Sequence, residues 1–413
     1  MERTTAMREA RLRCPRRSMI RTGLARRAAL GVLLAAASGA WAQRDARQSF
    51  ALQVPSAPTP VTIGGQARLV YELHLTSFAA EPLRLARIAV LDEASAATLA
   101  EFRGETLAAL LGRPGLEKGG DRSVVAPGLG AVAYLDVPFD ASRAGALRHR
   151  IDFESVPSGA AGRVEGGRTT PRPPAPARLG PPLRGGPWAA IYGAAWERGH
   201  RRVLYAVDGQ ARIPGRFAID WVKLDADGRS FAGDGRQPAD WYGYGADVLA
   251  VADATVAALR DDVPEPSAVT DGGRRVPIGD ASGNYVALKL ADGRYAFYEH
   301  LKPGSIRVRP GTQVRRGETI AALGYTGEST GPHLHFHLAD APLPLAAEGL
   351  PYAFEAWRPL GAYASIEAFA RAERWTPAKD DAPPTVAGEF PAPLAVIEFA
   401  DPAREAGQAA VRR

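Results

Sequence analysis

The sequence predicts an all-β protein built from antiparallel strands. Residues 67–78, ARLVYELHLTSF, alternate two sets of side chains, and shorter strand-like runs occur at 283–290 and 293–301. Alternation is typical of a half-buried strand, because successive side chains point to opposite faces of a sheet. Glycine and Asp-Gly turns separate the runs, and residues 246–338 contain no helix-length amphipathic pattern. Many short strands joined by turns indicate an all-β architecture.

The first 42 residues have the pattern of a removable export signal. They hold nine Arg and two acidic residues, and an apolar run at 28–37 is followed by small residues around position 41. This order predicts a signal peptide over 1–42 that is cleaved before Gln43, or an uncleaved anchor as the alternative. The apolar run is too short to span a bilayer as a mature helix. We therefore expect an exported protein, periplasmic or extracellular.

Charge and cysteine content exclude several classes of partner and site. The formal net charge is +6, but residues 1–42 alone carry +7, so the mature chain is almost neutral. No basic surface for nucleic acid or anionic lipid is expected. The only cysteine, Cys14, lies in the predicted signal. Histidine and carboxylate side chains must therefore build any metal site in the mature protein. We expect the mature protein to be a monomer.

The chain divides into several regions by composition. Residues 48–155 predict a small β-sandwich-like accessory domain with a short helix around 96–111, and its His74 and His149 are interpreted as surface histidines. Residues 156–187, rich in Pro, Gly and Arg, predict an extended, semi-flexible linker. A second β domain covers 188–345. The extension at 346–413 is expected to pack against it, with its final residues disordered.

The segment GPHLHFHLAD carries the most informative pattern. His333, His335 and His337 stand at alternate positions of a predicted strand, with apolar residues between them. The three imidazoles would share one face of the strand while the apolar side chains fill the core behind it. A zinc ion takes three or four N, S or O ligands, so this strand supplies only part of a zinc site.

Four separated stretches resemble the lysostaphin/LytM-type zinc metallopeptidases. They are GADVLAVADATV (245–256), GNYVALKL (283–290), YAFYEHL (295–301) and GETIAALGYTGESTGPHLHFHL (317–338). Most members of that family cut peptide cross-links of peptidoglycan. The resemblance covers little more than a third of the chain. It implies an antiparallel β-sheet metallopeptidase domain with a duplicated hybrid motif fold, a Zn²⁺ cofactor and a peptidoglycan-type substrate.

The resemblance also implies roles for individual residues. It makes His335 a zinc ligand, and His333 and His300 catalytic residues. Zinc can lower the pKa of a water molecule and polarise a carbonyl group, while nearby imidazoles accept the proton and stabilise charge. His337 occupies a position where the family commonly has an acidic or amide residue. We interpret His337 as lying beside the site or at its rim.

The family's remaining two ligands come from an H-x-x-x-D motif, from which this sequence departs. RFAIDW (216–221) places Asp220 correctly, but Arg216 stands at the histidine position. A guanidinium group cannot replace imidazole, because it stays protonated and offers no lone pair to a cation. His200 is the nearest unassigned histidine, and we predict that His200, Asp220 and His335 bind the metal. The alternative is that His200 is a surface residue.

A predicted hairpin explains how His200 could reach Asp220. Centred on Gln210, the hairpin would set His200 directly opposite Asp220, with Cβ atoms about 4.5–5.5 Å apart. A tight turn at 208–209 would instead oppose His200 to Phe217, unless residues 214–215 form a bulge.

Two functions remain open from the sequence. The first is an exported zinc metalloendopeptidase that cleaves peptidoglycan. The second is a catalytically inactive relative that serves as a binding or activator module for the cell wall or another hydrolase. Inactive relatives usually lose several site residues, whereas His300, His333, His335 and Asp220 are all present. The sequence therefore favours the enzyme.

Overall fold

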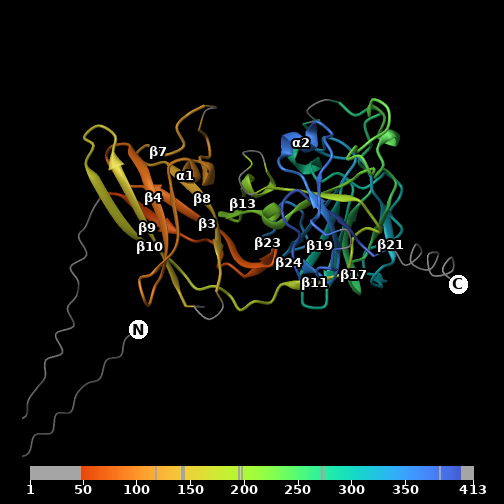
Figure 1. The fold of residues 1–413 in the computed structure, drawn as a ribbon, viewed down its shortest axis with the longest axis horizontal. Coiled ribbons are helices and arrows are strands. Elements are labelled where there is room, and N and C mark those ends of the chain that lie inside the picture. Colours follow the sequence, from red (N-terminus) through yellow and green to blue (C-terminus); the bar gives the residue numbers. More distant parts are fainter. Residues whose placement is uncertain are drawn as a thin grey trace, which may run out of the picture. The chain divides into compact units, whose positions relative to one another are not determined.

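The computed structural model describes residues 48–400 except 117–118, 141–144, 194–195, 197–198, 271–272, 274 and 381–382. These described residues all belong to one compact unit. The predicted signal peptide and Cys14 lie outside the described residues. Within the described ranges, strands dominate and two short α-helices occur, α1 (Gly104–Leu110) and α2 (Ile366–Ala370) (Figure 1). The predicted all-β class is confirmed.

The N-terminal strands form a sandwich of two antiparallel sheets, coloured orange to yellow in Figure 1. One sheet contains β1 (Phe50–Gln53), β2 (Val61–Ile63), β3 (Gln66–Ser77), β6 (Leu111–Gly112) and β8 (Gly130–Pro138). The other contains β4 (Leu83–Asp92), β5 (Thr98–Arg103), β7 (Val124–Val125), β9 (Leu147–Ser155) and β10 (Ala161–Thr169). Alternate residues of β3 fill the core between the sheets, as the pattern at 67–78 predicted: Leu69, Tyr71, Leu73 and Leu75.

Two sequence-based boundaries in this region were wrong. The segment 156–187 is not the extended, semi-flexible linker that we predicted, because β10 pairs with β9, and β11 (Ala177–Leu179) pairs in parallel with β24 (Tyr352–Phe354). Its apolar residues are few but well placed, and Leu179 and Leu183 are buried in the main core. The predicted helix over 96–111 shrinks to α1, because β5 takes up residues 98–103.

His149 is a buried core residue, so its interpretation as a surface histidine was wrong. Its side chain is fully enclosed, its Nδ1–H donates to the Gly167 carbonyl at 2.9 Å, and its Nε2 accepts from the Tyr71 hydroxyl at 2.8 Å. Both ring nitrogens are thus satisfied in the neutral form, so the buried ring needs no charge to make these hydrogen bonds. Burial lowers the pKa of His149 from 6.5 to about 4, although the main-chain acceptors at Gly167 and Gly166 oppose the shift.

We expect this histidine to make the sandwich less stable in acid. Its folded-state pKa lies below the unfolded value, so its contribution is complete above 6.5 and is lost as the pH falls towards 4. The free energy of unfolding should drop by about 2 kcal/mol between pH 7 and pH 5 through this group. Urea unfolding of His149→Gln should show a correspondingly smaller drop than wild type. An equal drop in both proteins would contradict the assignment.

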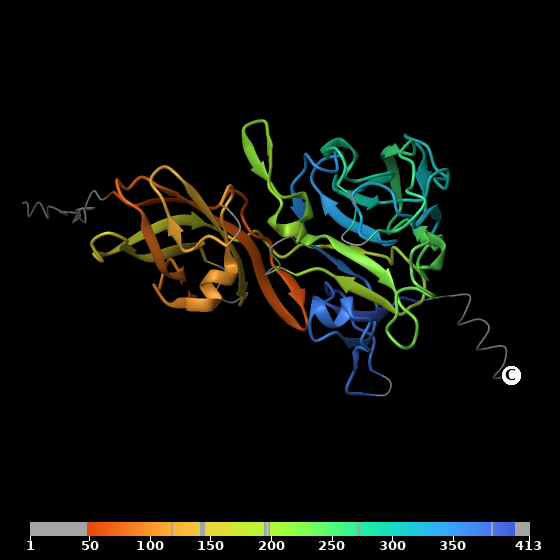
Figure 2. The same cartoon turned by 90° about the horizontal axis from the view of Figure 1, so that it is seen from above.

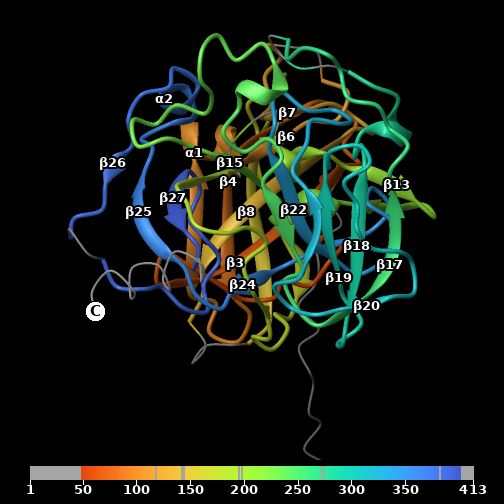
Figure 3. The same ribbon diagram turned by 90° about the vertical axis from the view of Figure 1, so that its right-hand side faces the viewer.

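A third, larger sheet carries the candidate site. Its order is β20-β17-β18-β19-β22-β15-β12-β27-β25-β26, with β23 paired to β22, and all these neighbouring strands are antiparallel. Figure 3 shows β22, β19, β18 and β17 side by side. The strands are β12 (Trp188–Ile191), β15 (Ile219–Lys223), β17 (Ala254–Arg260), β18 (Tyr285–Leu290), β19 (Tyr295–Glu299), β20 (Gln313–Val314), β22 (Leu334–Ala339), β23 (Gly349–Leu350), β25 (Arg358–Ala362), β26 (Thr376–Pro377) and β27 (Ala395–Glu398).

The C-terminal segment is part of this sheet. β27 pairs with both β12 and β25, and Ile397 and Phe399 are buried in the main core. The final residues of the chain, which we predicted to be disordered, lie outside the described residues, which end at residue 400. A separate pair of strands, β16 (Asp247–Leu249) and β21 (Thr319–Ala322), packs its apolar side chains into the same core. None of the helices in the described ranges has the length and apolar character of a membrane span.

Between β12 and β15 the chain forms a hairpin and two 3₁₀-helices. The hairpin strands are β13 (Tyr205–Val207) and β14 (Gln210–Arg212), and Figure 2 shows this yellow-green hairpin projecting from the main sheet. The 3₁₀-helices are His200–Arg202 before the hairpin and Pro214–Phe217 after it. The first of these short helices contains His200 and the second contains Arg216.

Candidate metal centre

A row of three polar residues crosses the main sheet at its centre. Asp220 of β15 is directly opposite His335 of β22, and His335 is directly opposite Glu299 of β19. Directly opposed residues place their side chains on the same face with Cβ atoms about 5 Å apart. The sheet itself therefore sets His335 between two carboxylates.

One pocket is lined by His335 and His337 of β22 and by His333, which directly precedes this strand, as their spacing predicted. Leu334, Phe336 and Leu338 are fully buried on the opposite face. His333, His335 and His337 are also almost fully buried, with exposed fractions of 6, 7 and 1%. They line a pocket of about 430 Å³ together with the following residues: His200, Asp220, Glu299, His300, Ser329 and Leu345 among others. The histidine face of β22 is thus enclosed rather than a solvated polar face.

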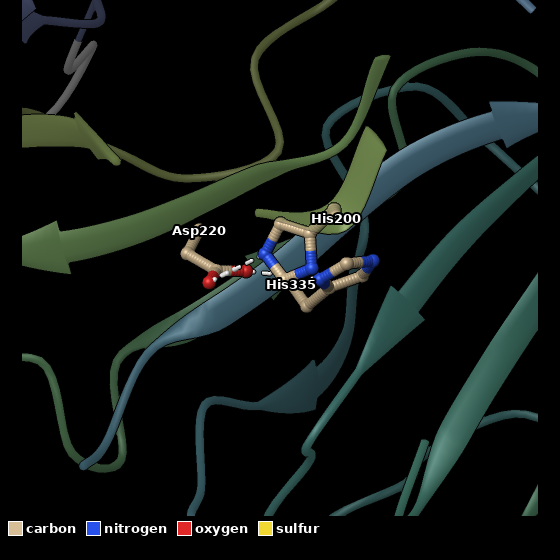
Figure 4. Close-up of side chains that lie close together, drawn as sticks. All are labelled: His200, Asp220 and His335. Atoms are coloured by element: carbon tan, nitrogen blue, oxygen red, sulfur yellow. Dashed lines mark hydrogen bonds and ion pairs between the residues drawn. The ribbon is translucent and has the colours of Figure 1, made fainter. Parts of the chain in front are cut away.

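The structure brings His200 to Asp220. The imidazole Nε2 of His200 lies 2.8 Å from Oδ2 of Asp220, and Nδ1 of His335 lies 2.9 Å from Oδ1 of the same carboxylate (Figure 4). The rings of His200 and His335 are 4.6 Å apart, edge to face. In Figure 4 the two imidazoles converge on the carboxylate from different segments of the chain. This is the trio predicted from the sequence.

The hairpin register that we used to predict this contact was wrong. The turn lies at Asp208-Gly209, with Val207 opposite Gln210, so it is not centred on Gln210. Continued pairing would have set His200 opposite Phe217. Instead, the 3₁₀-helix at Pro214–Phe217 interrupts the strand and passes close to His200: a Cβ atom added to Gly215 would lie 2.7 Å from the His200 Cβ. The extra residues of this helix bring Asp220 level with His200.

Asp220 is the electrostatic centre of the site. Its Oδ1 is also 3.3 Å from Nε2 of His333. Burial alone would raise the pKa of Asp220, but His200 and His333 hold it well below its ordinary range. Burial would likewise lower the pKa of His200, and the Asp220 carboxylate reverses that shift and raises it. The carboxylate is therefore ionised and able to bind a cation.

The ligand atoms of His200, Asp220 and His335 fit a zinc ion in kind and spacing. One atom from each residue lies within 4.8 Å of the other two. Two imidazole nitrogens and one carboxylate oxygen are ordinary zinc ligands, and three protein ligands are typical of catalytic zinc sites. The Asp220 carboxylate already holds both imidazoles within hydrogen-bond distance of its oxygens. Little rearrangement is therefore needed to bind a metal.

His300 and His333 lie next to this trio with their ring orientations fixed. His300 follows β19 in a left-handed conformation, with φ of +62°, which is uncommon for a residue other than glycine. Its Nδ1–H donates to the Thr326 carbonyl at 2.8 Å, and the Nδ1–H of His333 donates to the Gly331 carbonyl at 2.8 Å. The two rings are 4.8 Å apart. Each histidine therefore keeps its Nε2 for the site.

The surroundings move the pKa values of these two histidines in opposite directions. Burial, with the nearby His333 and His335, holds the pKa of His300 well below its ordinary value. Burial would also lower the pKa of His333, but the Asp220 carboxylate outweighs it and raises that pKa. A neutral imidazole can accept a proton, and a protonated one can stabilise negative charge.

Glu299 and the buried position of His337 were missed by the sequence analysis. Glu299 is 4% exposed and its Oε1 lies 3.7 Å from Nδ1 of His337. His337 is not at a rim, because its ring is buried and stacked on Phe297 at 4.8 Å. Oε1 of Glu299 and both ring nitrogens of His337 make no hydrogen bond among the described residues. With His335 these two residues form a second possible ligand set, which shares His335 with the first.

The strand register was the signal that could have identified Glu299. The alternation in YAFYE puts Phe297 and Glu299 on one face, and antiparallel pairing of this strand with LHFHLA sets them opposite His337 and His335. The sequence does not give that register by itself.

Comparison with known proteins assigns part of the chain to a protein family. Residues 241–345 match the model of peptidase family M23. The chain carries a peptidase family M23 domain. His300, His333 and His335 lie inside the matched residues, whereas Asp220 and His200 precede them. The M23 domain confirms the resemblance found in the sequence.

Curated relatives match over short lengths. Peptidoglycan DD-endopeptidase ShyC of Vibrio cholerae serotype O1 is 33% identical over 92 residues, which are 22% of this chain and 19% of ShyC. Peptidoglycan DD-endopeptidase ShyA of the same organism is 42% identical over 57 residues, which are 14% of this chain and 13% of ShyA. The chain therefore matches less than a fifth of the length of either relative.

Two solved structures are also similar in part. The catalytic domain of lysostaphin from Staphylococcus simulans is 18% identical and covers 40% of this chain and 88% of its own, with a TM-score of 0.22. A zinc-containing peptidase from Vibrio cholerae is 15% identical and covers 70% of this chain and 83% of its own, with a TM-score of 0.24.

Proposed function

We propose that this protein is an exported zinc metalloendopeptidase that hydrolyses peptide bonds of bacterial peptidoglycan. The observation that carries the proposal is the convergence of His200 and His335 on Asp220, beside His300 and His333 in one pocket. A metal-ligand trio next to two oriented imidazoles suits metal-assisted hydrolysis.

In this proposal His200, Asp220 and His335 hold the metal. Zinc would supply a Lewis acid that polarises the scissile carbonyl and makes water acidic enough to attack at neutral pH. His300 accepts a proton from the attacking water through its free Nε2, because its Nδ1–H donates to the Thr326 carbonyl. His333 stabilises the negative charge that develops on the carbonyl oxygen and donates a proton to the leaving amine.

The substrate and compartment follow from different observations. The curated relatives are named peptidoglycan DD-endopeptidases, which supports a cell-wall peptide as the substrate. The pattern of residues 1–42 supports export with cleavage before Gln43. A peptidoglycan substrate also requires the enzyme to act outside the cytoplasm.

The test combines metal analysis with hydrolysis. Protein recovered from the exported fraction should have the intact mass of a chain that begins at or near Gln43. It should contain about one zinc per chain. It should release peptides from purified peptidoglycan, and chelation followed by zinc addition should abolish and restore that release.

The inactive alternative gives a different result. Arg216, which replaces the histidine of the family motif, is the observation that favours a binding or activator module. Such a module would bind cell-wall material or a partner hydrolase but hydrolyse no peptidoglycan preparation, even with zinc fully bound. That outcome would reject the enzyme.

A further inference from the structure

The segment that carries His200 is fastened to the N-terminal sandwich by the two arginines that follow it. Arg201 and Arg202 donate hydrogen bonds of 2.7–3.0 Å to three main-chain carbonyls of sandwich strands, those of Tyr71, Leu135 and Leu111. The guanidinium group of Arg202 also lies 4.5 Å from the centre of the Tyr134 ring. The His200 backbone is therefore held by residues far away in the sequence.

The carboxylate of Glu72 in the sandwich connects this segment to Arg216, the residue that stands at the histidine position of the family motif. Oε1 of Glu72 accepts from Nε of Arg201 at 2.8 Å, and Oε2 accepts from Nε of Arg216 at 2.7 Å. Nη2 of Arg216 in turn lies 2.6 Å from Oε1 of Glu348. The side chains of these four residues, which we call the buried ion cluster, are 3–8% exposed.

The buried ion cluster is balanced only when it is complete. It contains two cations and two anions, and burial of any one charge without its partners is costly. Although burial would raise the pKa of Glu72, Arg216 and Arg201 hold it below its ordinary value, so Glu72 is ionised. A buried cluster of this kind restricts its members to one arrangement. It therefore restricts the residue next to Arg201, which is His200.

Packing supports the same connection. Val61 and Val70 of the sandwich strands β2 and β3 belong to the main core, where they are buried with Phe217 and Phe390. The sandwich thus contacts the chain that follows His200 in two ways, by apolar packing and by the buried ion cluster.

We propose that Glu72 is a positioning residue of the metal centre. By holding Arg201 and Arg216, Glu72 fixes His200 beside Asp220 and His335, and the N-terminal sandwich is a component of the metal site. The arrangement also accounts for Arg216: at the position of the family histidine, it connects the sandwich to Glu348 instead of binding metal. This inference rests on the proposed function, because it assumes that His200 is a ligand.

The test is the substitution Glu72→Gln, which keeps the shape of the side chain and removes its charge. Zinc affinity, measured by competition with a chelator, should fall about 10–100-fold, as it does when partners behind a metal ligand are lost. With Co²⁺ in place of zinc, the visible absorption spectrum should shift towards that of His200→Ala. A role in stability alone would leave the ligand set, and hence the spectrum, unchanged.

Asp152→Asn is the matched control. Asp152 pairs with Arg87 at 3.1 Å and with Arg163 at 2.6 Å within the sandwich, and neither arginine belongs to the buried ion cluster. This variant should bind zinc as wild type does and give the wild-type cobalt spectrum. If Glu72→Gln does not fold, Arg201→Lys is measured in the same way, because it keeps the charge but loses the forked hydrogen bonds.

The outcomes separate this inference from the proposed function. Loss of zinc in His200→Ala, with wild-type zinc affinity and cobalt spectrum in the folded Glu72 or Arg201 variant, would overturn the positioning role alone. Wild-type zinc binding in His200→Ala would overturn the metal site itself. Weaker binding and a shifted spectrum in the cluster variant, with neither change in Asp152→Asn, would support the inference.

Discussion

His333→Ala is expected to lower the rate of peptidoglycan-peptide hydrolysis at least about a hundredfold, because general acid–base catalysis is worth roughly 10²–10⁴ in rate. Its ring is oriented by the Gly331 carbonyl, and its Nε2 faces the Asp220 carboxylate at 3.3 Å. His300→Ala should have an effect of similar size. Both variants should retain zinc, because neither residue belongs to the ligand trio. Steady-state kinetics at full zinc loading provides the measurement.

His149→Gln is a suitable control for these two variants. It also removes a buried histidine, but from the core of the sandwich, where its ring contacts Tyr71 and Gly167. Its kcat should match that of wild type at neutral pH. If His333→Ala and His300→Ala hydrolyse the peptide as fast as wild type, the assignment of proton transfer and charge stabilisation to these residues is wrong.

Loss of a ligand should have the second large effect. His200→Ala and His335→Ala are each expected to weaken zinc binding by more than about a hundredfold, since loss of an outer partner alone costs about 10–100-fold. Hydrolysis should fall with zinc occupancy. Dialysis against buffered zinc followed by metal analysis gives both affinities.

Glu299→Gln distinguishes the two possible ligand sets. Glu299 and His337 form the second set with His335, so only one set contains His200. If the metal is bound by His200, Asp220 and His335, Glu299→Gln should keep most of its zinc affinity while His200→Ala loses it. The reverse result would place the metal at Glu299 and His337 and would reject our ligand assignment.

The sequence predicted the strand residues of the site better than the loop residues. The alternation from His333 to Leu338 predicted a strand with apolar side chains on one face, because a strand alternates its faces over any length. The structure has this strand as β22, which begins at Leu334 and buries its apolar side. The proximity of His200 to Asp220 was predicted with an incorrect hairpin register. A 3₁₀-helix at Pro214–Phe217 supplies the real path, and local sequence does not determine where such a helix interrupts a strand.

Burial in the sandwich was the other property that the sequence did not reveal. Glu72 and His149 alternate with apolar or charged neighbours along their strands, as exposed residues also do. Their burial depends on partners from distant strands: Arg201 and Arg216 for Glu72, and the carbonyl of Gly167 for His149. Residues 161–169 pair with β9 although their composition is typical of a linker, because main-chain hydrogen bonds form a strand without a large apolar content.

The position of Arg216 bears on how such a site could change during evolution. Returning a histidine to position 216 would restore the family motif in the sequence, but it would leave Glu72 and Glu348 buried without their shared cation. Breaking a buried ion pair in this way typically costs about 3–5 kcal/mol, a large part of the stability of a protein of ordinary size. The family's ligand arrangement and this one therefore differ by more than residue 216, because Glu72 and Glu348 are matched to the arginine that stands there.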